Sequence, residues 1–325
     1  MSIRSTRLRW FSSLFITFVS IFAAIPSSAQ LRQSEPPASS KDVEIVFLGT
    51  GTPVSNADRQ GPSLAIVANG KAYLVDAGSG VVRQANSAFQ RGIPGLQPHE
   101  LDIAFLTHLH SDHTLGLPDL ILTPWVLDRT KPLRLYGPEG TKEMATHILE
   151  AYKEDILVRT TGLEGANPTG YKIEANDVRP GNIYQDGNVR VKAFLVKHGS
   201  WKEALGYRFD AGGKSIVVSG DTAPAESVVE ACAGCDVLIH EVYSGRGPSA
   251  TKPSKSVEEI VKYLSEFHTS ALELGEIAAK AKPKMLILTH SFLYGDAKPE
   301  DMVREIRQKY SGPIAIARDL DVIAP

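Results

Sequence analysis

The stretch His108-Leu109-His110-Ser111-Asp112-His113 places four potential metal ligands within six residues, directly after the apolar run of residues 103–106. Because side chains alternate in direction along an extended chain, His108 and His110 point the same way and can bind one cation. Asp112 and His113 follow at once and can bind a second cation beside the first. The alternative is a polar loop with unrelated histidines, and the density of ligand residues disfavours it. The spacing therefore predicts a two-metal site at the end of a buried strand.

The first 29 residues have the composition of a secretory signal. Three arginines form a basic start, residues 11–25 form an apolar core, and Ser27-Ser28-Ala29 is typical of a cleavage site before Gln30. The alternative is a membrane anchor that is not cleaved. No later segment is long and apolar enough to span a bilayer. We therefore expect a periplasmic or secreted protein, with no stable membrane association once residues 1–29 are removed.

The composition of the mature chain bears on its organisation and partners. Removal of residues 1–29 deletes three Arg and no acidic residue, so the formal net charge changes from -2 to -5. An acidic chain lacks the basic stripe of most nucleic-acid-binding proteins, so no nucleic-acid partner is expected. Residues 30–41 are typical of a flexible tether, and residues 42–325, which no such linker divides, are expected to form a single domain. The sequence leaves a homodimer open.

Cys232 and Cys235 are the two cysteines of the chain. A zinc ribbon or zinc finger needs a second Cys/His pair at a suitable spacing, and the sequence supplies none. Export permits a disulfide between the two thiols, and a reduced pair at a helix end is equally compatible with the sequence. Neither state implies catalysis.

Short β-rich runs recur along the chain, and each ends in polar residues. These runs cover residues 43–48, 72–75, 103–106, 189–196, 215–218, 237–239 and 285–288. Stretches with helical character lie between them, including residues 141–154, 225–233, 256–267 and 270–282. This alternation predicts an α/β architecture in which loops at one edge of the sheets gather the reactive side chains.

Taken together, these polar clusters resemble those of the metallo-β-lactamase fold superfamily, and within it the branch that includes tRNase Z and secreted arylsulfatase-like hydrolases. The resemblance spans residues 43–325 and rests on Leu48-Gly49-Thr50-Gly51-Thr52-Pro53, Asp76-Ala77-Gly78-Ser79-Gly80, residues 108–113, His198, Ser219-Gly220-Asp221-Thr222, Ile239-His240-Glu241, His268-Thr269-Ser270 and Leu288-Thr289-His290-Ser291. It implies an αββα sandwich, in which two mixed β-sheets are flanked by helices and the metals bind at one edge.

The resemblance also implies the ligands of two zinc ions. The first zinc would be held by His108, His110 and His198, the second by Asp112, His113 and His290, and Asp221 would bridge the two. A hydroxide between the ions would be the nucleophile, because zinc lowers the pKa of bound water towards neutrality. Two Zn²⁺ ions bring four positive charges against three negative charges from Asp112, Asp221 and the hydroxide. The surplus positive charge favours an anionic ester as substrate.

Further roles follow from the same family pattern. Asp112 and His268 are the predicted catalytic residues, and His268 matches the tRNase Z histidine that stabilises or protonates the leaving group. Asp76 and Glu241 are predicted to support the site by hydrogen bonds rather than by binding metal, and His240 is not expected to bind metal either.

Several activities are compatible with this ligand set. The main prediction is an exported dinuclear zinc hydrolase, arylsulfatase-like or phosphodiesterase-like, that cleaves a small-molecule anionic ester. Aromatic residues near the ligands in sequence, Trp125, Trp201, Phe292 and Tyr294, favour such an ester because they can form apolar walls.

Three alternatives stay open. A tRNase Z-like endoribonuclease is the first, although only 22 residues separate His198 from Asp221, where bacterial tRNase Z usually carries a long tRNA-binding arm. A lactonase or β-lactamase-type acyl hydrolase is the second; Asp221 disfavours the β-lactamase, whereas lactonases share the ligand set. The third is a metal-binding scaffold without activity, which the presence of all seven ligands disfavours.

Overall fold

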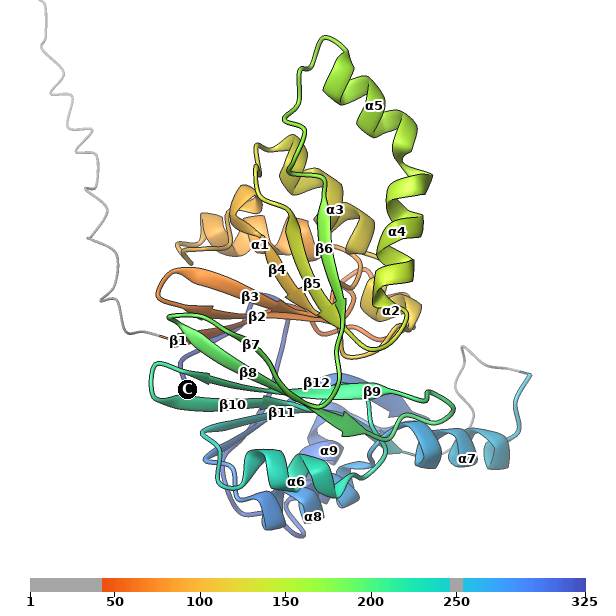
Figure 1. Ribbon diagram of the computed structural model, residues 1–325. Coiled ribbons are helices and arrows are strands. Elements are labelled where there is room, and N and C mark those ends of the chain that lie inside the picture. Colours follow the sequence, from red (N-terminus) through yellow and green to blue (C-terminus); the bar gives the residue numbers. More distant parts are fainter. Residues whose placement is uncertain (1–42, 246–253) are drawn as a thin grey trace, which may run out of the picture. The chain divides into compact units, whose positions relative to one another are not determined.

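Two β-sheets packed face to face form the centre of the computed structural model, which describes residues 43–245 and 254–325 (Figure 1). The first sheet has the order β14-β1-β2-β3-β4-β5-β6, and the second has the order β13-β12-β11-β10-β9-β8-β7. The first sheet consists of β1 (Val43–Gly49), β2 (Ser63–Ala68), β3 (Lys71–Val75), β4 (Ile103–Phe105), β5 (Leu133–Gly137), β6 (Ile173–Asp177) and β14 (Val322–Ile323). The second consists of β7 (Gly181–Gln185), β8 (Val189–Val196), β9 (Ala204–Ala211), β10 (Lys214–Val218), β11 (Val237–Gly245), β12 (Met285–Tyr294) and β13 (Ile314–Ile316).

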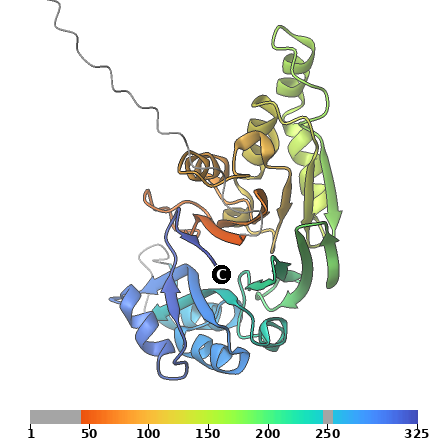
Figure 2. The ribbon, with the colours of Figure 1, turned by 90° about the vertical axis from the view of Figure 1, so that its left-hand side faces the viewer.

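Helices cover the outer faces of both sheets (Figures 1 and 2). The first sheet carries α1 (Val81–Gln90), α3 (Leu117–Val126) and α4 (Thr141–Ala151), and α5 (Lys153–Thr161) continues from α4 beyond the sheet. The second sheet carries α6 (Glu226–Cys232), α8 (Ala271–Ala281) and α9 (Pro299–Ile306). The short helices η1 (Pro98–Glu100) and α2 (Ser111–Thr114) and the helix α7 (Val257–Phe267) lie in connections. Both sheets contain parallel and antiparallel pairs. The predicted αββα sandwich with two mixed sheets is therefore confirmed.

The predicted helices and strands appear close to their expected bounds, with one instructive exception. Strands were expected to end at residues 239 and 288, but β11 and β12 continue to Gly245 and Tyr294. Their parallel pairing survives through a register shift, since Glu241 pairs with Thr289 and Val242 with Ser291. His290 is the extra residue of this β-bulge and has a φ of 45°. The bulge lets the strand continue while His290 leaves the regular alternation of side chains.

Aromatic rings fill the space between the sheets. The ring of Phe105 in β4 lies 5.2 Å from that of Tyr136 in the same sheet, and 5.7 and 5.5 Å from those of Tyr207 and Phe209 in the other. All the apolar residues of the inner faces belong to one buried cluster, whereas the outer faces pack against their helices in two others. The two sheets therefore share one core, and this core fixes their strand ends against each other.

Asp186, in the turn between β7 and β8, links the two sheets next to the first residue of β8, Val189. Its carboxylate accepts hydrogen bonds of 2.7 Å from the hydroxyls of Tyr73 and Tyr184 and pairs with Lys71 at 3.1 Å. Burial alone would raise the pKa of Asp186, but the hydrogen bonds from Tyr73, the Asn188 amide and Tyr184 lower it well below its usual range. The carboxylate is thus held ionised in the folded chain.

The cysteine pair and the membrane association of the chain were both left open or expected from the sequence. Cys232 and Cys235 form a disulfide at the end of α6, which settles the alternative that the sequence left open. Over the described residues, the structure contains no helix with the length and apolar character needed to cross a membrane. The predicted signal of residues 1–29 and the tether of residues 30–41 lie outside the described residues.

Asp186→Asn should lower the free energy of unfolding at pH 7 by about 1 kcal/mol, because an amide accepts weaker hydrogen bonds and cannot pair with Lys71. The folded-state pKa of Asp186 is depressed, so its stabilisation is complete above the unfolded pKa of roughly 3.9 and is lost as the pH falls further. Denaturant unfolding at pH 7 and pH 3 should therefore show the difference between wild type and variant narrowing at the lower pH. Asp210→Asn, at the surface beside Arg208, is the control. A difference that stays constant with pH would contradict the assignment.

Candidate metal centre

The seven predicted metal ligands lie together where strands of both sheets end. His108 to His113 follow β4, His198 follows β8, Asp221 follows β10, and His290 lies at the bulge of β12. Their ligand atoms form overlapping groups in which every atom lies within 4.8 Å of the others: His108, His110 and His198; His108, His113 and Asp221; Asp112, His113 and His290. Residues separated by up to 182 positions are thus brought to one point by the packing of the two sheets.

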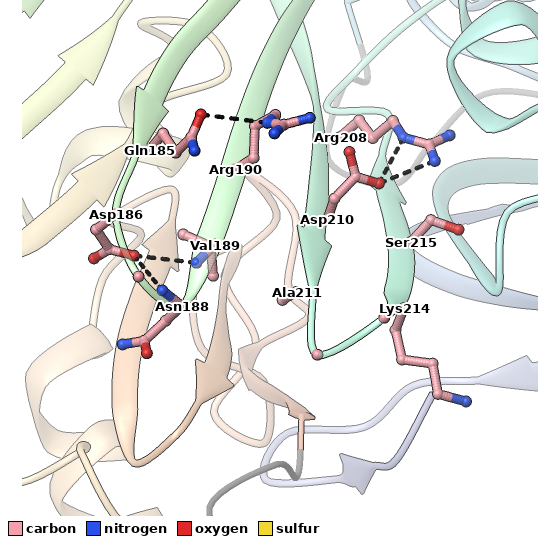
Figure 3. A pocket seen from close by; sticks show the side chains of 13 residues that line it. Gln185, Asp186, Asn188, Val189, Arg190, Arg208, Asp210, Ala211, Lys214 and Ser215 are labelled. Carbon is pink, nitrogen blue, oxygen red and sulfur yellow. Dashed lines mark hydrogen bonds and ion pairs between the residues drawn. The ribbon is translucent and has the colours of Figure 1, made fainter.

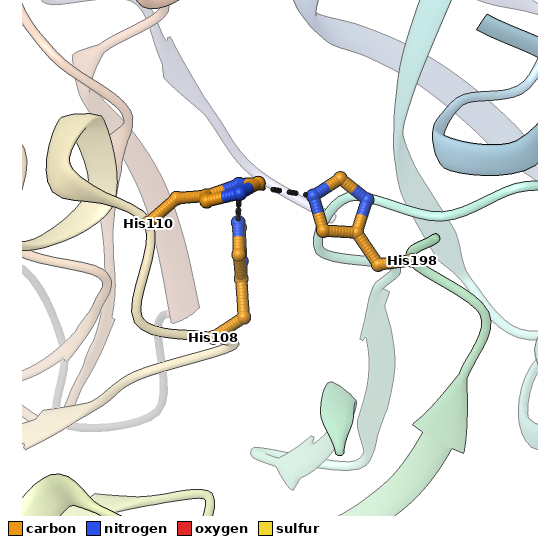
Figure 4. Close-up of side chains that lie close together, drawn as sticks. All are labelled: His108, His110 and His198. Atoms are coloured by element: carbon orange, nitrogen blue, oxygen red, sulfur yellow. Dashed lines mark hydrogen bonds between the residues drawn. The ribbon is translucent and has the colours of Figure 1, made fainter. Parts of the chain in front are cut away.

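Three imidazoles form the first ligand set. The Nδ1 atom of His110 lies 3.0 Å from Nε2 of His108 and 3.1 Å from Nε2 of His198 (Figure 4). Burial lowers the pKa of His108 well below its ordinary value and lowers that of His198 to about 4. Both rings are therefore neutral at pH 7, which is the form that binds a metal ion.

The second set combines two imidazoles with two carboxylates. Asp112 Oδ2 lies 3.2 Å from Nε2 of His290 and 3.7 Å from Nε2 of His113, while Asp221 Oδ1 lies 3.4 Å from Nε2 of His113 and 3.5 Å from Nδ1 of His290. His113 Nε2 and His290 Nδ1 are buried and have no hydrogen-bond partner. Because buried polar atoms are almost always satisfied, a cation among these four side chains fits the donor set.

Asp221 is the residue that the two sets have in common. It is 3% exposed, and its carboxylate also belongs to a group with His198 and His268. Burial raises the pKa of Asp221, but the imidazoles of His290 and His113 outweigh burial and hold it well below the ordinary value. For His113, burial lowers the pKa, and the carboxylates of Asp221 and Asp76 raise it well above the usual value. The centre therefore contains a fixed negative charge between two groups of nitrogen ligands.

Asp76 supports both sets without belonging to either. This residue, with a φ of 60°, follows β3 and is 5% exposed. Its carboxylate accepts hydrogen bonds from the Thr107 amide at 2.8 Å, the Thr107 hydroxyl at 2.9 Å and Nδ1 of His113 at 2.8 Å. Since the Thr107 proton is directed to Asp76, Nδ1 of His108 donates to the Thr107 oxygen at 3.0 Å. In both histidines Nδ1 is thus the nitrogen held by Asp76 or Thr107, and Nε2 faces the centre, where it would bind a cation after losing any proton it carries.

Two contacts around the first set could not be read from the sequence. Nδ1 of His198 donates to the carbonyl oxygen of Phe267 at 2.7 Å, which leaves Nε2 free. Trp201 Nε1 donates to Nε2 of His110 at 2.8 Å. A cation bound at Nδ1 of His110 would move the ring proton to Nε2 and end this contact. Phe267 acts through its backbone carbonyl, so its side chain carries no sequence signal, whereas Trp201 was expected near the ligands and does lie there.

Glu241 contacts the predicted general acid rather than the metal ligands. Its Oε1 atom accepts hydrogen bonds from the amides of Thr269 at 3.0 Å and Thr222 at 3.3 Å, and lies 3.4 Å from Nδ1 of His268. Burial lowers the pKa of His268, but the carboxylates of Glu241 and Asp221 outweigh burial and raise it. His268 is 2% exposed, so its ring is held inside the fold beside the cluster. Glu241 orients His268 and the loop that carries Asp221.

Some residues that the sequence placed near the metals have other surroundings. Trp125 is buried in the core between the first sheet and its helices, where its indole donates to the carbonyl of Asn167. Its predicted place in the site wall is therefore wrong, because α3 directs the side chain into the core. His240 is fully buried, and its Nδ1 donates to the carbonyl of Glu241. Phe292 does lie at the site, 4.9 Å from the ring of His290.

A cavity of about 490 Å³ lies at the turns that join β7 to β8 and β9 to β10 (Figure 3). These turns are at the opposite end of β8 from His198. Among the charged side chains there, Arg190 donates to Gln185 and Arg208 pairs with Asp210. The cavity therefore lacks the converging reactive groups that distinguish the metal centre.

Comparisons with known proteins find relatives along most of the chain. Residues 71–291 match the family model described as "Beta-lactamase superfamily domain". Ribonuclease Z of Mycobacterium marinum is 32% identical over 282 residues, which are 86% of this chain and 97% of that protein. Two solved structures share the fold. The metallo-β-lactamase fold protein YhfI from Bacillus subtilis has a TM-score of 0.65 at 19% identity, and the match covers 87% of this chain and 100% of the YhfI chain. The short form of human tRNase Z has a TM-score of 0.62 at 21% identity, over 86% of this chain and 98% of its own.

Asp221→Asn should lower the affinity for both metal ions, because one carboxylate lies between the two ligand sets and the amide removes its charge. Zinc-loaded mature protein should carry about two ions per chain after dialysis, as measured by inductively coupled plasma mass spectrometry, and the variant should carry fewer than one. Asp210→Asn, which changes an acid on the surface of β9, should retain both ions. Two tightly bound ions in Asp221→Asn would contradict the bridging position.

Proposed function

The chain belongs to the metallo-β-lactamase superfamily of metal-dependent hydrolases, and on that basis we propose that it hydrolyses phosphodiesters at a dinuclear zinc centre. The observation that carries the proposal is the position of Asp221 between two complete ligand sets. Two neighbouring cations can neutralise a phosphoryl group and stabilise both its attacking and its leaving oxygen. A monoanionic phosphodiester also matches the surplus positive charge of two zinc ions among these ligands.

The relatives change the order of the candidate substrates. The main prediction from the sequence was the hydrolysis of a small anionic ester, arylsulfatase-like or phosphodiesterase-like, whereas the Mycobacterium marinum protein that is similar along 97% of its length is a ribonuclease Z. This similarity supports a phosphodiester over a sulfate ester, a lactone or a β-lactam. It also weighs against the expectation that no nucleic acid is bound. An RNA phosphodiester is accordingly the first candidate substrate.

A small phosphodiester is the second candidate, and one observation favours it. The 22 residues between His198 and Asp221 form the hairpin of β9 and β10, joined by Gly212 and Gly213. They leave no room for a long arm that could hold a folded RNA. An exported protein would also be separated from cellular tRNA, and the Cys232–Cys235 disulfide fits the oxidising compartment that we propose. N-terminal sequencing of the exported chain, with Gln30 expected first, tests this location.

The side chains of the centre have separable tasks in this reaction. Bound zinc would supply a water molecule of lowered pKa and positive charge for the phosphoryl oxygens. Thr107 and Asp76 hold Nδ1 of His108 and His113, so both rings already turn Nε2 towards the place where a cation would bind. His268, held by Glu241, can give a proton to the leaving oxygen as its bond to phosphorus breaks.

A cleft beside the centre can receive the rest of the substrate. It has a volume of about 170 Å³. Its lining includes Arg59, Phe292 and Tyr294 and other residues of the segments 51–59 and 291–294. The guanidinium of Arg59 donates to the carbonyl oxygens of Thr50 and Ser291, which fixes a positive charge next to His290. Apolar rings and one cation suit an organic phosphate rather than a neutral acyl compound.

Zinc-loaded mature protein should hydrolyse bis(p-nitrophenyl) phosphate, and its rate should exceed that on p-nitrophenyl sulfate, a chromogenic lactone and a chromogenic β-lactam. Cleavage of a precursor tRNA in the same assay distinguishes the RNA substrate from a small phosphodiester. The Asp221→Asn variant controls for contaminating hydrolases. Turnover of the sulfate or the β-lactam without turnover of any phosphodiester would refute the proposal.

His268→Ala should leave the zinc content unchanged and reduce kcat by something on the order of 10²-fold for a phenyl phosphodiester, because the leaving phenolate then receives no proton. For the p-nitrophenyl ester, whose leaving group needs less protonation, the loss should be smaller. Steady-state kinetics on the two esters measure the contrast. Equal losses on both would exclude proton donation and leave His268 a positioning or electrostatic role.

A further inference from the structure

Tyr263 brings a hydroxyl group beside His268, the proton donor of the proposed reaction. Its oxygen lies 3.4 Å from Nε2 of His268, whereas the other ring nitrogen of His268 lies 3.4 Å from Glu241. The imidazole of the predicted acid is therefore flanked by a carboxylate at one nitrogen and a phenol at the other. A leaving oxygen that takes the proton from Nε2 must arrive beside the Tyr263 hydroxyl.

The backbone around α7 fixes this arrangement. Ser256 and Glu259 form a capping box at the start of the helix, and Ile260 and Leu264 bury its inner face against Phe292 and Tyr294. The helix ends at Phe267, and His268 has an extended conformation with a φ of -136°. This change of direction turns the His268 ring back towards Tyr263, whose own ring stacks on that of Phe267 at 4.7 Å. The hydroxyl is thus positioned by helix packing.

The surroundings of His268 leave few routes to its Nε2 atom. Its ring is enclosed by those of Phe292 at 4.7 Å, His198 at 5.3 Å and Tyr263 at 5.6 Å. Burial raises the pKa of the Tyr263 hydroxyl, so it carries its proton at neutral pH. A neutral phenol has one proton to donate and can direct it to Nε2 of His268 or to an oxygen placed beside that atom.

We propose that Tyr263 is a catalytic residue that donates a hydrogen bond to the leaving-group oxygen, next to the proton donor His268. This inference rests on the hydrolysis proposed above. As the bond from phosphorus to the leaving oxygen breaks and the bond to the water oxygen forms, His268 transfers its proton to the leaving oxygen. Tyr263 keeps its own proton and stabilises the charge that develops there. The attacking water supplies the proton that restores His268, so the reaction consumes one water and needs no other reactant.

The test compares two phosphodiesters that differ only in the leaving group, phenyl and p-nitrophenyl, on the zinc-loaded enzyme. Tyr263→Phe, which removes only the hydroxyl, should reduce kcat about 10-fold for the phenyl ester and about 2-fold for the p-nitrophenyl ester, with KM little changed. Tyr243→Phe is the matched control: this tyrosine packs against the same aromatic cluster, and its hydroxyl bonds to Ser270. It should show no dependence on the leaving group.

The double variant separates a contact with the substrate from a contact through His268. If Tyr263 acts on the leaving oxygen, then Tyr263→Phe should still reduce kcat for the phenyl ester when His268 is already alanine. No further loss in the double variant would overturn the proposal and make Tyr263 a positioning residue for His268. Equal losses on the two esters, or no loss, would also overturn it.

An error in the proposed function gives a different result. In that case the wild-type enzyme itself does not hydrolyse phosphodiesters, before any variant is compared. The phenyl and p-nitrophenyl forms of whichever ester the enzyme does cleave then give the same contrast for Tyr263. Zinc content and circular dichroism of each variant show whether the fold and the centre are intact.

Discussion

The hydrogen bonds that the buried Asp76 carboxylate accepts from Thr107 and His113 are the contacts on which the rest of the centre depends. They join the end of β3 to the loop after β4 and fix the proton on the nitrogen of each histidine that faces away from the centre. An imidazole with its proton on the wrong nitrogen cannot bind a cation without first rearranging. One carboxylate therefore prepares His113 directly and His108 through Thr107.

The second sheet supplies the remaining three ligands of the centre. His198 is held by a backbone carbonyl of Phe267, Asp221 follows β10, and His290 reaches the cluster because a bulge interrupts β12. None of these residues could approach the first sheet unless the aromatic core around Phe105 held the two sheets together. The centre is thus a property of the interface between the sheets, and the loops only carry its ligands.

Helix α7 links the centre to the leaving-group side. Its last carbonyl holds His198, the next residue is His268, and Tyr263 lies one turn earlier. A cation bound by His198 and a proton carried by His268 would therefore be positioned by the same few residues. Such an arrangement would preorganise both charges before a substrate arrives, and preorganised charge is a large source of rate acceleration in enzymes.

The sequence by itself determined an α/β architecture, since the alternating runs and the polar clusters after each strand are local patterns. Its resemblance to the metallo-β-lactamase superfamily implied the αββα sandwich and the seven side chains to examine as metal ligands. Only the tertiary structure decided how they are supported. Trp201 and His110 lie 91 positions apart, and Glu241 and His268 lie 27 apart, so no local pattern records these contacts. The bulge at His290 depends on pairing with β11, and the approach of Tyr263 to His268 depends on the end of a helix. Hydrogen bonds between distant segments are set by packing, because the same local sequence could direct these side chains elsewhere if the sheets and α7 were placed differently.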